Sequence, residues 1–562
     1  MILNPSIPEL PARGTAPSRG ERFVIRASVE QVLLAACVFW LLTANRGFFG
    51  AALVGRALSD PQTWGFALAV GMLLVVAHFF PLALLANRWT VKPLLALLFV
   101  ATALAAHFTQ AYGVYLDPTM LRNVLRSDLA EARELFSWAL LLQLLLYAGL
   151  PLMVLWRTRI VHRAMPRAIA VRLGVLLLAA VTAGAALLGV FKPFSSLMRQ
   201  HKEVRYLITP ANYLWSLASV VATDARGAAV PRRAIGLDAV PGPSWTTRSK
   251  PMVVVLVVGE TARAANWGLT GYARQTTPEL AGLPVINFTQ VTSCGTNTEV
   301  SVPCMFAPVG RRDYDEARIN GSESLLHVLA RAGVDVHWRD NQSGCKGVCA
   351  GLSSDSVASL GIAGLCADGR CLDAGLLHGL DERLASASGR QLLVLHQLGN
   401  HGPSYFRRYP PGLARFQPAC ENDDLGQCSR EEIVNAYDNA LLYTDQLLAS
   451  LIARLQAQAE QVDSAVIYVS DHGESLGENN LFLHGMPYAI APAEQKSVPM
   501  VMWLSDGLRH AGAIDIDCLQ RRAHKPASHD HLFHTLIALL DVRTVLYEPD
   551  WDLLSACRAG VR

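Results

Sequence analysis

Three short stretches of the sequence place metal-binding side chain types directly after apolar runs. Glu260 follows MVVVLVVG, the pair Asp471-His472 follows SAVIYVS, and His401 comes shortly after QLLVLH. Carboxylates combined with imidazoles suit zinc or a similar divalent cation. Each feature also has an ordinary explanation, as a solvated carboxylate, a turn or a loop histidine. The combination at equivalent positions predicts a shared site.

The segment VTSCGTNTEVSVPCMF carries a second kind of chemistry. It places the hydroxyl groups of Thr296, Thr298 and Ser301 between Cys294 and Cys304. A disulfide here would stiffen the loop, with a stabilisation of roughly 2–3 kcal/mol for so short a loop. A metal-bound threonine hydroxyl loses its proton near neutral pH, as metal-bound water does. If Thr298 begins a helix, the first backbone N–H groups could hold a phosphate. Spacing alone does not choose between the two threonines, and two unrelated buried cysteines remain the alternative.

Parallel strands are the elements that must bring these groups together. Short apolar runs predict strands at 251–259, 334–338, 391–396, 464–470 and 498–504, and helical patterns at 322–332 and 430–456 lie between them. Strands that alternate with helices predict an α/β domain with a mainly parallel sheet. Ligands of such sheets bind beyond the carboxyl ends of the strands, which is where the candidate side chains lie.

The first third of the chain is typical of a membrane domain. The chain has 562 residues, 51% of them hydrophobic, and a mean hydropathy of +0.27. Five apolar runs are long enough for membrane helices, at about 28–45, 64–86, 93–111, 136–156 and 173–190. The first is the weakest, and a signal peptide is its alternative. Arginine and lysine cluster before the first run, between the second and third, and between the fourth and fifth, which predicts a cytoplasmic N-terminus.

These patterns predict three parts: a membrane domain over 1–191, a linker over 192–250 and a catalytic domain over 251–562, outside the cytoplasm. The net charge of +3 is nearly neutral, and the sequence has no basic low-complexity tract or nucleic-acid-binding motif. We therefore expect no nucleic acid partner.

Ten of the eleven cysteines follow the membrane part, and eight of these form four close pairs. Close, even-numbered cysteines indicate disulfides in an oxidising compartment, and a zinc-ribbon cluster is the alternative. The spacings differ and no CxxC occurs, which favours disulfides. The predicted pairs are Cys294–Cys304, Cys345–Cys349, Cys366–Cys371 and Cys420–Cys428. Cys518 and Cys557 could form a fifth bridge or stay as free thiols.

Several long stretches resemble the lipid A phosphoethanolamine transferases, inner-membrane enzymes of Gram-negative bacteria within the alkaline phosphatase/sulfatase-like superfamily. The stretches that carry the resemblance are GETARAANWGLTGYARQTTPEL, SCGTNTEVSVPCMF, WRDNQSGCKGVC, HQLGNHGPSYFRRYP, SDHGESLGENNLFLHGMPYAIAP and SHDHLFHTLIALLDV. The resemblance implies a five-helix membrane domain and a periplasmic α/β domain of the alkaline-phosphatase/sulfatase-like type.

The resemblance also implies roles for individual residues. Thr298 would be the nucleophile, and a tightly bound zinc ion would be held by Glu260, Thr298, Asp471 and His472. His401 and His484 would contact the phosphate or a second, weaker zinc ion. Ser343 and Lys346 would contact the phosphoethanolamine group. His396 and His529 receive a structural role, and Gln342 receives none.

By the same resemblance, phosphatidylethanolamine is the donor and a phosphate of lipid A the acceptor, through a ping-pong mechanism in a monomeric enzyme. The product surface is less negative, so polymyxins would bind it less well. Asn123, Ser127 and Glu131 are spaced to share one helical face, where the family places donor contacts. A solvated face is the ordinary explanation of this spacing.

Other functions remain as alternatives. A phosphoethanolamine transferase that acts on lipopolysaccharide core sugars would carry the same residues. A non-enzymatic membrane sensor would require a broken site, whereas every candidate residue is present. A sulfatase would need an arginine that SVPCMF lacks, and a transporter would need charges inside the membrane runs.

Overall fold

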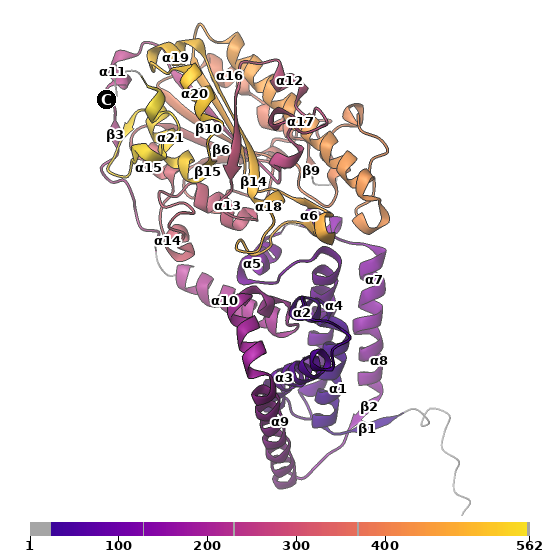
Figure 1. Ribbon diagram of the computed structural model, residues 1–562. Coiled ribbons are helices and arrows are strands. Elements are labelled where there is room, and N and C mark those ends of the chain that lie inside the picture. Colours follow the sequence, from indigo (N-terminus) through magenta and orange to yellow (C-terminus); the bar gives the residue numbers. More distant parts are fainter. Residues whose placement is uncertain (1–23, 128, 229–230, 368–369, 559–562) are drawn as a thin grey trace, which may run out of the picture. The chain divides into compact units, whose positions relative to one another are not determined.

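The computed structural model describes residues 24–127, 129–228, 231–367 and 370–558 (Figure 1). Two compact units can be distinguished. The first contains the residues up to Leu104 together with Leu142–Gln200, and the second contains Ala105–Leu141 together with the residues from His201 onward. The segment Ala105–Leu141, which joins the third apolar run to the fourth and includes the adjoining end of each, thus packs with the C-terminal part of the chain.

Long apolar helices dominate the N-terminal part of the chain. Four helices in the described residues are long and apolar enough to cross a membrane: α3 (Pro61–Leu85), α4 (Val91–Tyr112), Trp138–Arg157, which joins α7 (Trp138–Leu144) to α8 (Leu150–Arg157), and α9 (Met165–Gln200). They match four of the five predicted runs. The N-terminal region is therefore an integral membrane domain.

The first predicted crossing is not one straight helix. Helix α1 (Val29–Ala44) ends at Asn45, whose side chain amide donates a hydrogen bond to the Trp40 carbonyl. Helix α2 (Arg46–Ala52) follows at a bend of 62°. The pair counts as a fifth span only if both helices are taken together.

Residues 192–250 contain more regular structure than the linker that the sequence suggested. Helix α9 continues through Pro193 to Gln200, with a non-helical residue at Val190, and α10 (Ala211–Ala228) follows. Proline ends a helix only when the lost hydrogen bond and the ring clash cannot be accommodated, and here the kink at Val190 accommodates them.

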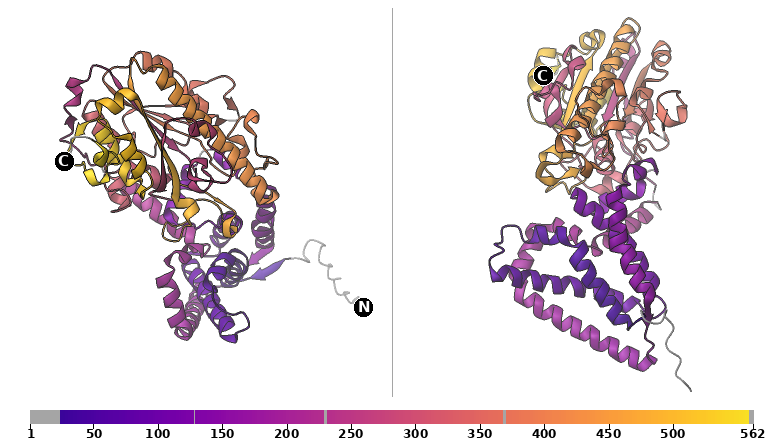
Figure 2. Two further views of the ribbon diagram at one scale, coloured as in Figure 1. Left: turned by 45° about the horizontal axis from the view of Figure 1, so that its top comes forward. Right: turned by 90° about the vertical axis from the view of Figure 1, so that its right-hand side faces the viewer.

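The second unit is built on an eight-stranded sheet with strand order β15-β5-β14-β11-β4-β10-β6-β7 (Figures 1 and 2). Only β14 runs antiparallel to its neighbours. The strands are β4 (Met252–Gly259), β5 (Ile286–Thr292), β6 (Asp335–Asp340), β7 (Ser353–Ser356), β10 (Arg390–His396), β11 (Asp463–Ser470), β14 (Ser497–Leu504) and β15 (Ala527–Ser528). The predicted α/β fold with a mainly parallel sheet is confirmed.

Burial on both faces explains the apolar runs of the central strands. Every residue of β4 is buried. Val254, Leu256 and Val258 join a core with side chains of α13 (Thr298–Met305), α15 (Leu325–Arg331) and α21 (Asp530–Leu539). Helix α17 (Arg430–Ala457) lies along the opposite face of the sheet in Figures 1 and 2. A sheet covered on both faces reads as continuous hydrophobic stretches rather than as alternation.

Five disulfides are present in the second unit. They are the four predicted short-range pairs and the wider pair Cys518–Cys557. Among the described residues, Cys37 is the one free cysteine, and it is buried in α1. The pairing agrees with an oxidising environment for this unit.

Candidate active site

Glu260, Asp471 and His472 meet at the carboxyl ends of β4 and β11. Their ligand atoms all lie within 4.8 Å of one another, and all three side chains are buried. His472 Nε2 lies 3.4 Å from Glu260 Oε1 and 3.3 Å from Asp471 Oδ2. Two carboxylates and one imidazole with free lone pairs form a donor set that suits a divalent cation such as zinc.

The strand register explains why these groups converge. Strands β4 and β11 are parallel neighbours, with Gly259 opposite Ser470, so the next residue of each strand lies at the same edge. The backbone N–H groups of Thr261 and His472 donate to Asp471 Oδ1, whereas Oδ2 accepts no hydrogen bond from any described residue. His472 Nδ1 lies 2.9 Å from the Gly473 carbonyl, so this nitrogen carries the proton and Nε2 is left as a ligand atom.

The electrostatics of this cluster also favour a cation. Burial, reinforced by the charge of Glu260, raises the pKa of Asp471 to about 7. Burial disfavours charged His472, but Asp471 and Glu260 outweigh it and raise the pKa of the imidazole to about 9. Burial likewise opposes ionisation of Glu260, whose pKa is nevertheless lowered because His472 stabilises the carboxylate. The raised pKa values mean that Asp471 and His472 hold protons near neutral pH, and a bound cation would displace these protons and neutralise the carboxylates.

Thr298 is the hydroxyl that faces this cluster. Its Oγ1 lies 3.2 Å from each carboxylate oxygen of Glu260 and 3.4 Å from His472 Nε2. It is the first residue of α13, after the N-cap residue Asn297. The Thr296 hydroxyl instead donates to the Met486 carbonyl at 2.6 Å. The geometry therefore separates two threonines that spacing could not.

The loop that carries Thr298 is held at both ends. The Cys294–Cys304 bridge closes it, and the Ser301 hydroxyl accepts a hydrogen bond from the Gly295 N–H inside it. The Cys294 N–H donates to His529 Nδ1, and His529 Nε2 lies 2.9 Å from the Ser470 carbonyl. His529 thus ties the loop to the end of β11, in keeping with the structural role expected for it.

His401 and His484 lie beside the cluster. The ring centroids of His484 and His472 are 4.4 Å apart, and those of His401 and His484 are 5.7 Å apart. His484 Nδ1 lies 2.7 Å from a carboxylate oxygen of Glu474, whose other oxygen accepts from Tyr405. Burial lowers the pKa of His484 despite the nearby carboxylate. The Nδ1 proton then points at Glu474 and leaves Nε2 free for a ligand.

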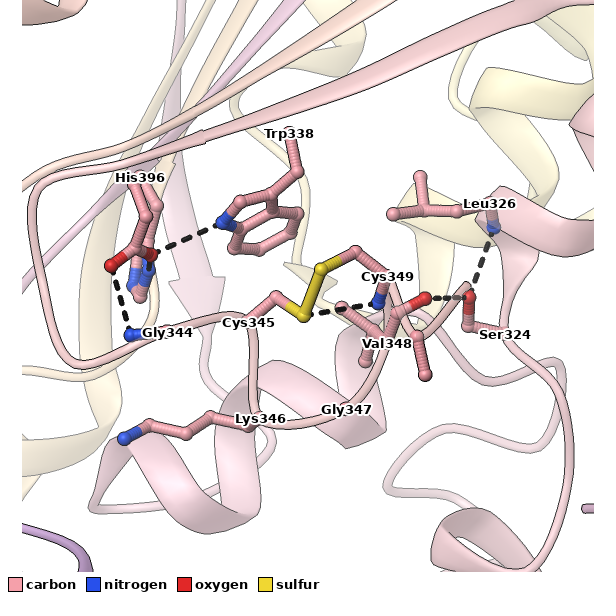
Figure 3. Close-up of a disulfide and its surroundings, with 12 residues drawn as sticks. Ser324, Leu326, Trp338, Gly344, Cys345, Lys346, Gly347, Val348, Cys349 and His396 are labelled. Carbon is pink, nitrogen blue, oxygen red and sulfur yellow. Dashed lines mark hydrogen bonds and ion pairs between the residues drawn. A yellow bond between two sulfur atoms is a disulfide. The ribbon is translucent and has the colours of Figure 1, made fainter. Parts of the chain in front are cut away.

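Lys346 and Ser343 lie on a neighbouring loop beyond β6. The ammonium group of Lys346 donates to the Ser343 hydroxyl at 2.6 Å and pairs with Glu299 Oε1 at 3.1 Å. Lys346 is enclosed by the Cys345–Cys349 bridge and has a left-handed backbone, with φ of 49° (Figure 3). A non-glycine residue in this conformation costs about 1–3 kcal/mol, which is tolerated chiefly at functional sites.

Sequence reasoning assigned no role to three residues that contact the candidate site. Glu474 orients His484, and Gln342 donates to Glu260 Oε2 at 3.3 Å. Glu299 lies between Lys346 and Arg126, which approaches its other oxygen at 2.8 Å. Glu474 follows Asp471-His472-Gly473 directly, and Glu299 follows Thr298, so proximity to a candidate residue was the available signal.

Asn123, Ser127 and Glu131 do not lie on one continuous helix, although their spacing suggested it. Helix α5 (Pro118–Arg126) ends at Ser127, which has an extended backbone, and α6 (Leu129–Glu134) is a separate helix. The Ser127 hydroxyl donates to the Asn123 carbonyl, a local bond that competes with helix continuation. The side chain of Glu131 lies outside the described residues. Helical periodicity therefore does not extend from Asn123 across this break.

Family models match the N-terminal and the C-terminal parts of the chain. The family model described as Phosphoethanolamine transferase EptA/EptB matches residues 74–225, and the model described as Sulfatase matches residues 252–542. Phosphoethanolamine transferase EptA of Escherichia coli (strain K12) is 36% identical over 536 residues, which cover 94% of this chain and 96% of that protein. Phosphatidylethanolamine transferase Mcr-1 of Escherichia coli is 37% identical over 530 residues, which cover 92% and 96%.

A solved structure agrees over nearly the whole chain. The integral membrane protein lipooligosaccharide phosphoethanolamine transferase A (EptA) from Neisseria meningitidis matches with a TM-score of 0.90 and 36% identity, and the match covers 95% of this chain and 99% of that one. The chain belongs to the phosphoethanolamine transferase family that includes EptA and Mcr-1, within the alkaline phosphatase/sulfatase-like superfamily.

Proposed function

We propose that the protein transfers phosphoethanolamine from phosphatidylethanolamine to a phosphate of lipid A through a covalent intermediate on Thr298. The observation that carries the proposal is the placement of Thr298 Oγ1 against Glu260 and His472 at the start of a helix. The family supports the transferred group. The name of Mcr-1, phosphatidylethanolamine transferase, supports the donor.

Glu260, Thr298, Asp471 and His472 would hold one zinc ion. Their buried oxygen and nitrogen atoms fit it, because Asp471 Oδ2 accepts no hydrogen bond from the described residues and His472 Nε2 is left as a ligand atom. A bound zinc ion would lower the pKa of the Thr298 hydroxyl and neutralise charge on phosphoryl oxygens. A second, weaker ion would fit beside His401 and His484.

The reaction has two halves, and Thr298 carries the transferred group between them. In the first, Thr298 Oγ1 bonds to the donor phosphorus and the phosphorus–oxygen bond to diacylglycerol breaks. In the second, an acceptor phosphate oxygen bonds to that phosphorus, the bond between phosphorus and Thr298 Oγ1 breaks, and the threonine hydroxyl regains its proton. The start of α13 favours phosphoryl oxygens, and His401 and His484 would bind them from the other side.

Lys346 and Ser343 would bind the donor phosphate together, since the Lys346 ammonium group is hydrogen-bonded to the Ser343 hydroxyl. Asn123, Ser127 and Glu131 stay as proposed headgroup contacts, although not on one continuous helix. We further propose a monomer in the inner membrane with a cytoplasmic N-terminus and residues 251–562 as the periplasmic catalytic domain. Transfer to lipid A would reduce the negative surface charge and hence polymyxin binding.

Intact mass measurement on the purified full chain tests this proposal. After incubation with phosphatidylethanolamine, the zinc-loaded protein should gain the mass of one phosphoethanolamine, and Thr298→Ala should not. Thr296→Ala, a matched loss of hydroxyl and methyl groups in the same loop, should still gain it. An adduct on Thr298→Ala would exclude Thr298 as the nucleophile. Adding lipid A, or lipid A with core sugars, to the loaded protein then shows by product mass which acceptor group is modified.

A further inference from the structure

A polar cavity lies in the second unit, between the end of α6, the hairpin of β8 (Cys366–Ala367) and β9 (Arg370–Cys371), and the segment around Arg407. Its volume is about 620 Å³, within the range of small-molecule pockets. The described charged side chains that line it are Arg133, Glu134, Arg370, Arg407 and Asp423. Three of these five are arginines, so the lining favours an anion.

The three arginines differ in whether a carboxylate of the protein already pairs with them. Arg407 pairs with Asp423 through two nitrogens, each 3.1 Å from a carboxylate oxygen, and Arg370 lies 3.4 Å from Glu134. Arg133 is exposed and makes no side-chain hydrogen bond or ion pair with the described residues. The exposed edge of the cavity therefore offers a cation that the fold itself does not neutralise.

Glu134 connects this cavity to the candidate active site. Its carboxylate accepts from both terminal nitrogens of Arg408, and Arg408 Nε donates to the His401 carbonyl at 2.7 Å. The Arg408 side chain is 1% exposed and that of Glu134 is 7% exposed. A single buried arginine therefore links the cavity wall to the backbone of His401.

Two short disulfides hold the cavity walls. Cys366–Cys371 closes the hairpin that lines it, and Cys420–Cys428 closes the loop that carries Asp423. Glu134 also lies four residues before Trp138, where a candidate membrane span begins. A cavity with disulfide-held walls and an arginine at its edge that no described carboxylate neutralises suits the phosphate of a lipid headgroup.

We propose that this cavity binds a phosphate group of the acceptor glycolipid other than the phosphate that is modified. The inference rests on the proposed function, because it assigns the anion to the acceptor. Free inorganic phosphate shares the same chemistry and is the competing ligand. Occupation of the cavity would orient the acceptor so that its second phosphate reaches Thr298 beside His401.

The test separates the two half-reactions. Full-length protein is first loaded from phosphatidylethanolamine, and discharge is then timed by intact mass after adding bisphosphorylated lipid A in detergent micelles. The double variant Arg133→Gln/Arg407→Gln should load like the wild type but discharge about 10–100-fold more slowly, as expected for lost charge-assisted hydrogen bonds. The matched control is Arg415→Gln, which removes an exposed arginine from the same segment outside the cavity lining.

Monophosphorylated lipid A makes the test specific. The wild type should discharge more slowly to this acceptor, and the double variant should lose nothing further, because the group that the cavity would bind is absent. The inference is overturned if the double variant and the wild type discharge to bisphosphorylated lipid A at the same rate. It is also overturned if the double variant discharges more slowly than the wild type by the same factor with both acceptors. If inorganic phosphate, at the same concentration as bisphosphorylated lipid A, slows wild-type discharge to the rate of the double variant, the cavity is a free-anion site and the assignment is wrong. Failure of the wild type to load would instead refute the proposed function, and the inference with it.

Discussion

Thr298 Oγ1 is equidistant from the two carboxylate oxygens of Glu260, at 3.2 Å from each. The same carboxylate lies 3.4 Å from His472 Nε2 through Oε1 and accepts from Gln342 through Oε2. One buried side chain thus contacts the candidate nucleophile and the candidate metal ligands together. Its charge should matter to both metal retention and nucleophile activation.

Glu260→Gln should abolish tight zinc binding. The amide keeps the size of the side chain but removes one of two buried negative charges. Loss of a residue that only supports a metal ligand lowers metal affinity about 10–100-fold, so loss of a ligand itself should lower zinc affinity by at least about 100-fold. Elemental analysis of dialysed protein measures the zinc content per chain. Glu279→Gln, an exposed glutamate on α12 (Pro278–Ala281), is the matched control. Unchanged zinc retention in Glu260→Gln would show that Glu260 is not a ligand.

The sequence predicted the parts of this site that lie directly beyond buried strands. The runs before Glu260 and Asp471 are apolar because both faces of β4 and β11 are covered, and parallel pairing fixes which end carries the ligands. Strand β5 was missed because polar residues interrupt it, so it has no continuous apolar run, and β15 was missed because it has only two residues.

Contacts between distant segments could not be predicted. The pairings of Glu474 with His484 and of Glu299 with Lys346 depend on packing that no local pattern encodes. The end of α5 at Ser127 was not predicted either, because the spacing from Asn123 onward fits a helix equally well and the extended backbone of Ser127 has no local sequence signal.

Glu299→Gln should slow formation of the phosphoethanolamine adduct by about 10–100-fold while zinc is retained. The side chain of Glu299 is 2% exposed and that of Lys346 is 4% exposed, so the variant would leave a buried ammonium group without its counter-charge. Breaking a buried ion pair in this way destabilises a protein by about 3–5 kcal/mol. The rate of adduct formation by intact mass is the readout. Glu548→Gln breaks the more exposed pair with Arg312 and should change little. Equal rates in Glu299→Gln and wild type would exclude a role for this pair in the first half-reaction.

Acid should destabilise the second unit partly through His534, which is remote from the candidate site in sequence. Burial lowers its pKa from 6.5 to about 4, so the folded protein keeps the imidazole neutral where the unfolded chain binds a proton. Stability therefore falls as the pH drops from about 6.5 toward 4, by about 2 kcal/mol between pH 7 and pH 5 for this group.

His534→Gln removes the titration and should flatten the pH dependence by about that amount. Denaturant unfolding of the detergent-solubilised chain at pH 7 and pH 5, followed by tryptophan fluorescence, gives the two free energies. His510→Gln, an exposed histidine on α19 (Asp506–Ala511), should leave the dependence as it is. An identical pH dependence in His534→Gln and wild type would contradict the assignment.

Gly399→Ala should displace Glu260 and thereby weaken both zinc retention and adduct formation. Gly399 has a left-handed backbone with φ of 54°, and an added Cβ would lie 2.7 Å from the Glu260 carbonyl oxygen and 3.1 Å from its Cβ. Because the contact is with backbone at the end of β4, no side chain rotation can relieve it. Gly389→Ala is the matched control: its φ is 58°, but nothing lies within 4 Å of the new Cβ. The control should lose about 1–2 kcal/mol of stability from backbone strain alone and keep its zinc. If both variants retained zinc equally, close packing of Gly399 on Glu260 would not be what positions the carboxylate.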